Sequence, residues 1–208
     1  MIGMMIAAAI GGSAIDAERA FARDAQRIGQ WAAFRKWAGQ DAVMFVPQTV
    51  WARDLLKGRK DPPRAMSWSP AESFTSCDGA VAINSGPWHI PGAKAQGRFT
   101  TIWLKKRLGW HWTYDGAEPL AEAPAAPAQP RSLRASCSGR PTGAPISHAP
   151  PLVRRPGPTP DDTGRGESGD RTLGWDWQVA KTGVRSFRVF QWTGHGYRQV
   201  VDQHIAAK

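Results

Sequence analysis

The sequence predicts an α+β fold in which N-terminal helices pack on a curved antiparallel sheet and a three-strand β-meander follows at the C-terminus. Three observations predict it. Residues 16–38 carry apolar side chains at helical spacing, residues 97–116 have the pattern of a β-hairpin, and residues 172–205 hold three short alternating segments separated by glycine turns. The 11 tryptophans can supply a core despite 17 prolines and 22 glycines.

The chain begins with an apolar segment, residues 1–14, that is too short to span a bilayer. It resembles the apolar part of a secretory signal and ends in the small residues Gly12, Ser13 and Ala14, although no Lys or Arg precedes it. We therefore expect a periplasmic or secreted protein without an integral membrane span. The alternative is a cytoplasmic protein in which this segment is an apolar helix start.

Residues 16–38 are expected to form a helix with one buried stripe. The intervening polar positions include Glu18, and Gly29 is a weak point at which the helix can split in two. A short strand at 41–47, stopped by Pro47, and a short helix at 50–56 follow. The stripe consists of Phe21, Ala25, Ile28, Trp31, Phe34 and Trp37.

Two hairpins are expected to build the sheet. Strands at 71–77 and 80–86 flank the turn Asp78-Gly79, and the hairpin 97–116 turns at a basic tip followed by Gly109. Strict alternation in its second strand predicts that one face carries Trp110, Trp112 and Tyr114 and the other carries His111, Thr113 and Asp115.

The composition divides the chain into four parts: a signal segment at 1–14, a main domain at 15–118, an irregular linker at 119–169 and the meander at 170–208. Residues 121–130 are an Ala/Pro stretch, and residues 141–169 are rich in Pro, Gly, Ser, Thr, Asp and Arg. We expect no packed element in the linker apart from an anchor near Cys137.

Two cysteines, Cys77 and Cys137, are far apart in the sequence. Cys77 lies at a hairpin turn that a partner can approach, Cys137 lies in the part of the linker with few prolines, and the apolar N-terminus indicates an oxidising compartment. We predict a Cys77–Cys137 disulfide. Two separate free thiols are the alternative.

The order of elements up to residue 116 resembles the nuclear transport factor 2-like superfamily, whose fold is an α+β cone around a pocket. The residues that carry the resemblance are Ala17–Ala22 (AERAFA), Trp37–Pro47 (WAGQDAVMFVP), Cys77–Gly79 (CDG) and Gly97–Gly116. The chain is most similar to bacterial members of unassigned activity, near the ketosteroid-isomerase-like and association-domain-like branches. The resemblance implies a pocket and a homodimer. It does not imply one activity, since members include enzymes and non-enzymatic modules.

Steroid-isomerase chemistry needs a carboxylate base on the strand after the first helices. The interior of that strand carries Val43, Met44, Phe45 and Val46, and Asp41 at its start caps or ends the helix. No acid therefore occupies the position of the base, and steroid-isomerase-like proton transfer is disfavoured. Asp115 and His111 are the remaining candidates for a general acid or base. Asp115 is equally explained as a strand-end turn residue, because Asp-Gly is a turn signal, and His111 as a structural strand residue.

The strongest constellation is aromatic. A cavity surrounded by such side chains would bind a flat apolar ligand, and core filling is the alternative. The expected lining residues are Trp31, Phe45, Trp51, Trp68, Trp88, Trp103, Trp110, Trp112 and Tyr114.

No metal or cofactor is expected, because no histidines have ligand spacing and no phosphate-binding glycine loop occurs. The formal charge of +10 is interpreted as a solvated basic surface rather than a nucleic-acid site, because the sequence has no run of five basic residues. The sequence therefore predicts an exported, non-catalytic pocket protein for a small apolar ligand. The alternatives are a cofactor-free lyase, hydrolase or isomerase-type enzyme and a structural dimerisation or partner-binding module.

Overall fold

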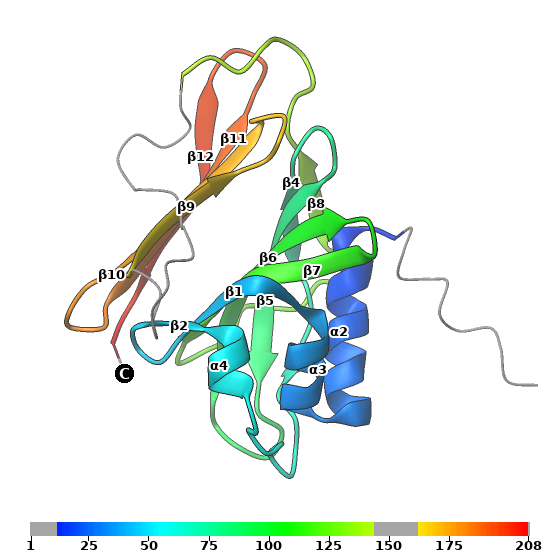
Figure 1. Cartoon of the computed structure of the whole chain (residues 1–208), viewed down its shortest axis with the longest axis vertical. Helices are drawn as coiled ribbons and strands as arrows, with labels where there is room; N and C mark the ends of the chain where they lie inside the picture. The colour runs from blue at the N-terminus through cyan, green and yellow to red at the C-terminus, as the bar shows by residue number, and fades with distance from the viewer. Residues whose placement is uncertain (1–11, 144–161, 208) are drawn as a thin grey trace, which may run out of the picture.

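The computed structural model describes residues 12–143 and 162–207 and has three layers (Figure 1). The helices α2 (Ala14–Ile28), α3 (Gln30–Trp37) and α4 (Ala52–Leu56) cover one face of an eight-stranded sheet. A separate four-stranded sheet packs on the other face. The predicted α+β class and the placement of helices against a sheet are confirmed.

The large sheet is mixed rather than purely antiparallel, which corrects the sequence prediction. Its order is β2-β1-β7-β6-β5-β4-β8, with β3 paired to β5. The pairs β1–β7 and β4–β8 are parallel because β1 and β8 each enter the sheet from a distant part of the chain rather than through a tight turn. The strands are β1 (Ala38–Phe45), β2 (Thr49–Trp51), β3 (Ser67–Trp68), β4 (Glu72–Thr75), β5 (Val81–His89), β6 (Gln96–Lys106), β7 (Gly109–Pro119) and β8 (Arg131–Arg134).

Helix α2 begins with a capping box. Ser13 Oγ accepts a hydrogen bond from Asp16 N at 3.2 Å, and Asp16 Oδ2 accepts one from Ser13 N at 3.0 Å. The helix ends at Gly29, whose φ of 104° lies outside the range of a right-handed helix, so α3 starts as a separate helix. The split that the sequence allowed at Gly29 therefore occurs.

A β-bulge changes the faces of β7. Trp103 pairs with Trp112 and Ile102 pairs with Tyr114, so Thr113 is an extra residue without a cross-strand partner on β6. Trp112 consequently faces the helices and Tyr114 faces the four-stranded sheet. The prediction that both lie on one face is wrong, because strict alternation cannot account for an inserted residue.

The C-terminal meander has four strands instead of three. They are β9 (Thr163–Glu167), β10 (Leu173–Val179), β11 (Arg185–Trp192) and β12 (Tyr197–Ile205), in the order β12-β11-β10-β9. The added strand β9 lies within residues 119–169, where the sequence predicted no packed element apart from an anchor near Cys137. The second strand in this range, β8, ends just before Cys137 and occupies the place of that anchor.

The glycines of β9 are typical of a loop in the sequence, but in the structure they are required by the packing of two tryptophans. Gly164 pairs with Trp177 and Gly166 pairs with Trp175. An ideal Cβ on either glycine would lie 2.3 Å from the ring of its partner, so only glycine leaves room for the indoles to lie across β9.

The predicted Cys77–Cys137 disulfide is present, with a Cα–Cα distance of 5.2 Å. It fixes the segment after β8 beside the four-stranded sheet. There Ser136 N donates to Trp192 O at 3.0 Å, and Trp192 Nε1 donates to Ser138 O at 2.9 Å. The bond therefore holds a linker segment against both sheets.

Candidate functional site

A cavity of about 380 Å³ lies where the two sheets meet at the C-terminal end of β7. Strand β1 pairs with β7 as far as Val43 and Tyr114 and then separates from it. The turn after β1, the end of β12 and the β10–β11 turn border the resulting half-open space. It is lined by Met44, Phe45, Val46, Pro47, Asp115, Gly116, Ala117, Pro119, Gly183, Arg185, Ile205 and Ala206.

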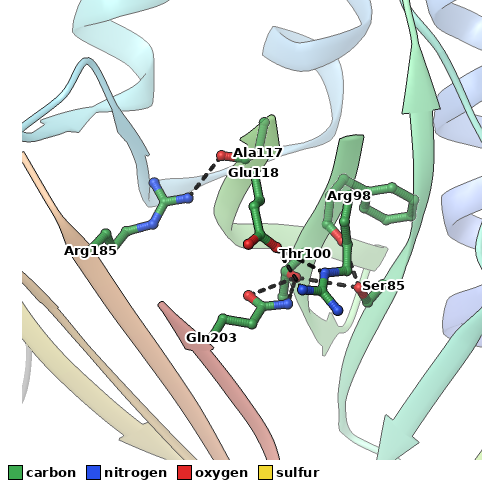
Figure 2. A network of polar contacts seen from close by, with 8 residues as sticks. Ser85, Arg98, Thr100, Ala117, Glu118, Arg185 and Gln203 are labelled. Atoms are coloured by element: carbon green, nitrogen blue, oxygen red, sulfur yellow. Dashed lines mark hydrogen bonds and ion pairs between the residues drawn. The ribbon is translucent and has the colours of Figure 1, made fainter. Parts of the chain in front are cut away.

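Arg185 is the principal polar residue that lines this cavity, and only 5% of its surface is exposed. It reaches from β11 to the large sheet, where its Nη2 donates to Ala117 O at 3.1 Å (Figure 2). Its Cζ lies 4.1 Å from the centre of the Phe45 ring. The Nε has no hydrogen-bond partner within the described ranges. Arg185 is thus held in a fixed orientation with donor capacity left over.

Gln203 on β12 makes a second link between the sheets beside Arg185. Its Nε2 donates to Thr100 Oγ1 at 3.0 Å on β6 (Figure 2). The same figure shows Arg98 and Glu118 paired across β6 and β7, with Arg98 Nη2 at 2.7 Å from Glu118 Oε2. Each contact therefore joins a strand that borders the cavity, β12 or β7, to β6 behind it.

Asp115 is one of the residues that line the cavity. Strand β7 continues to Pro119, so Asp115 lies within a strand and is not the strand-end turn residue that the Asp-Gly pair suggested. Its Oδ2 accepts a hydrogen bond from Thr101 Oγ1 at 3.3 Å. Burial raises the pKa of Asp115 to about 7, although the Thr101 hydrogen bond and the Arg185 charge lower it. Asp115 and Arg185 form no ion pair with each other in the described part of the chain.

Tyr114 lies behind the cavity wall. Its hydroxyl is buried without a hydrogen-bond partner among the described residues, and burial raises the pKa of Tyr114 to about 12. An ideal Cβ on Gly116 would come within 3.0 Å of this hydroxyl and within 2.9 Å of Arg185 Nη2. The absent side chain at Gly116 therefore lets Tyr114 and Arg185 approach each other.

The structure does not gather the predicted aromatic lining residues into one cavity. Phe45 lines the cavity described above, whereas Trp51 and Tyr114 are buried between the two sheets. The others belong to the core under the helices, namely Trp31, Trp68, Trp88, Trp103, Trp110 and Trp112. Trp68 and Trp88 also border a smaller cavity of about 280 Å³.

His111 and Asp115, the two acid–base candidates, are separated. His111 lines a shallow cavity of about 390 Å³ near the hairpin tip with Lys106 and Arg107, and its Nδ1 lies 3.3 Å from Gly109 O. Asp115 lines the cavity at the other end of β7. The two side chains do not form one site.

Glu18 is a buried carboxyl group that the sequence placed among polar positions of the first helix. It is fully buried and accepts hydrogen bonds from Trp68 Nε1 at 2.9 Å, Trp103 Nε1 at 2.6 Å and Asn84 Nδ2 at 3.3 Å. Burial raises the pKa of Glu18 to about 7, against the three hydrogen bonds, and the Asp115 carboxyl raises it further.

Glu18 and Arg185 had detectable signals in the sequence. Glu18 lies three residues before Phe21 and seven before Ala25, which puts it on the buried stripe of α2. Arg185 shares the alternation of Phe187 and Val189, which face inward on β11. A charged residue at an inward position was the available indication in both places.

Within residues 12–143 and 162–207, no group of three His, Cys, Asp or Glu side chains could hold a metal ion. No helix in the same ranges is long and apolar enough to cross a membrane. Comparisons of the chain with protein-family models, with curated proteins and with solved structures found no match.

Proposed function

We propose that the protein binds a small, largely apolar molecule in the cavity between β1, β7 and the meander, without transforming it. The observation that carries the proposal is a cavity of about 380 Å³ with mainly apolar walls in which Arg185 and Asp115 are held without pairing to each other. Small-molecule sites combine apolar walls with a few fixed polar groups in this way. The volume is within the range that drug-sized ligands occupy, about 300–1,000 Å³.

Saturation-transfer NMR with 2-naphthamide and 2-naphthoate tests the proposal. Both probes present a flat apolar ring, and at least one should bind. Ala206→Trp places a large side chain at an exposed lining position and should abolish the signal. Ala95→Trp makes the same change at an exposed position that does not line this cavity and should leave the signal intact. Absence of binding by both probes, or binding that Ala206→Trp does not reduce, would refute the proposal.

A second candidate function is acid–base catalysis by Asp115. A carboxyl group with a pKa of about 7 in an apolar cavity is suited to donating and accepting protons near neutral pH. The expected activity is exchange of the α-hydrogens of a small apolar ketone such as 2-tetralone in deuterated water. Asp115→Asn should abolish this exchange but leave ligand binding in place. Exchange at the solvent rate would leave the non-catalytic function as the only candidate.

We further propose that residues 15–118 form a nuclear transport factor 2-like domain and that the protein is exported. The order of α2, α3, β1 and the following hairpins supports the first proposal. The disulfide and the apolar N-terminal segment support the second, because disulfides persist in oxidising compartments. Mass determination of the protein from its own host, before and after thiol alkylation, tests export through loss of the N-terminal segment and retention of the bond.

A further inference from the structure

We propose that the ligand of this cavity is a monocarboxylic acid with a compact apolar body, whose carboxylate binds the guanidinium of Arg185. This inference rests on the proposed function and names the chemical class of the ligand. A carboxylate matches the planar donor arrangement of a guanidinium better than a hydroxyl or an amide does.

The first argument is the charge of Arg185. Burying a charged group is costly unless it is paired or hydrogen-bonded. Arg185 is 5% exposed, yet the described residues supply it with one carbonyl oxygen, that of Ala117, and no carboxylate in ion-pair contact. An anionic ligand would provide the missing negative charge.

The second argument is the fixed position of the guanidinium. Contact with the Phe45 ring on one side and the hydrogen bond to Ala117 O restrict its orientation before any ligand arrives. A donor that is already ordered loses little conformational entropy on binding, so the site is preorganised for a planar acceptor. Ala117 O is the one acceptor that the described residues supply to the five N–H donors of the guanidinium, so donors remain for a carboxylate.

The third argument concerns Asp115, the acidic residue among those that line the cavity. Its carboxyl is bound to Thr101 Oγ1 rather than to Arg185. Its pKa of about 7 leaves it largely neutral in mildly acidic solution, so it does not neutralise Arg185 there. Glu18 on α2, whose pKa the Asp115 charge raises, has a pKa of about 7 as well. Tyr114, the other titratable group of β7 at this place, is neutral at these pH values.

The apolar body follows from the walls. Met44, Val46, Pro47 and Ile205 surround the space next to Arg185 and offer no charged partner to the rest of the ligand. A ligand with one carboxylate and one bicyclic ring or a medium-length chain fits this division into one charged position and an apolar remainder.

Isothermal titration calorimetry at pH 6 with 2-naphthoate and 2-naphthamide tests the inference. The two probes have the same ring and nearly the same shape, and only the first carries a charge. The unmodified protein should bind 2-naphthoate about tenfold more tightly or better. Arg185→Met should remove this preference, and Arg185→Lys should reduce it because an ammonium lacks the planar donor pair.

Arg198→Met is the control, since it removes one positive charge from an exposed position on the same sheet and should preserve the preference. Equal affinity of the unmodified protein for the two probes would overturn the inference but leave the proposed function standing. This comparison uses only the unmodified protein, so it does not depend on whether a variant folds. A preference for 2-naphthoate that persists in folded Arg185→Met would also overturn it. Failure of both probes to bind would instead refute the proposed function.

Discussion

Trp103 donates a hydrogen bond from its indole Nε1 to Glu18 Oε2 at 2.6 Å and thereby joins β6 to α2 in the interior. Trp112, the cross-strand partner of Trp103, is equally buried, but its Nε1 has no hydrogen-bond partner in the described part of the chain. The two neighbouring tryptophans therefore differ in whether the indole nitrogen makes a hydrogen bond.

This difference predicts unequal effects of the same substitution. Trp103→Phe removes a donor from a buried carboxyl and should lower the free energy of unfolding by about 1–3 kcal/mol more than Trp112→Phe does. Each variant loses a similar amount of buried ring, so Trp112→Phe is the matched control. Urea unfolding at pH 8, where Glu18 is more ionised, measures both. Equal losses would show that the Trp103–Glu18 hydrogen bond contributes little.

The raised pKa of Glu18 predicts that the protein loses stability as the pH rises. Because the folded-state pKa is about 7 and the ordinary value is 4.5, the protonated form favours the folded state. Its contribution is complete below about pH 4.5 and is lost as the pH rises through 7, a change of about 3 kcal/mol. Asp115 acts with the same sign.

Thermal unfolding between pH 5.5 and pH 8.5 should therefore show a higher melting temperature at pH 5.5. In Glu18→Gln, which cannot ionise at this position, the difference should shrink to the part that Asp115 supplies. A melting temperature that stays level over this interval in the unmodified protein would contradict the pKa shifts of both groups.

Loss of the disulfide should destabilise the protein. The bond closes a loop with a sequence separation of 60 residues, and the chain-entropy model assigns about 4 kcal/mol to a loop of this length. The double variant Cys77→Ser/Cys137→Ser should unfold at lower urea concentration than the oxidised protein. It should match the unmodified protein measured after reduction, which serves as the control for the serine side chains. Equal midpoints of the oxidised and reduced proteins would contradict this prediction.

The glycines of β9 give a further prediction. In Gly164→Ala the new Cβ would lie 2.3 Å from the Trp177 ring, so β9 and the indole must separate and stability must fall. Gly196→Ala is the control, because no atom lies within 4 Å of an ideal Cβ there. Near-ultraviolet circular dichroism should report the change around Trp177 in the first variant alone. An unchanged spectrum and melting temperature in Gly164→Ala would place the ring elsewhere.

The sequence by itself determined those features of the fold that depend on contacts between residues close together in the chain. Ser13 and Asp16 provide the cap of α2, Gly29 provides its end, and the alternating segments provide three of the four strands of the meander. The disulfide was also predicted from local features, namely the position of Cys77 at a hairpin turn and of Cys137 in the part of the linker with few prolines.

The tertiary structure alone decided the rest, because each remaining feature depends on contacts between distant segments. Whether Thr113 bulges depends on how β6 pairs with β7, and whether Gly164 belongs to a strand depends on the Trp177 ring that lies across it. The sequence contains Arg185 and Asp115 but does not indicate that they lie near each other. Only the packing of the meander on the large sheet brings Arg185 and Asp115 to the same cavity, where burial, rather than either residue by itself, raises the pKa of Asp115.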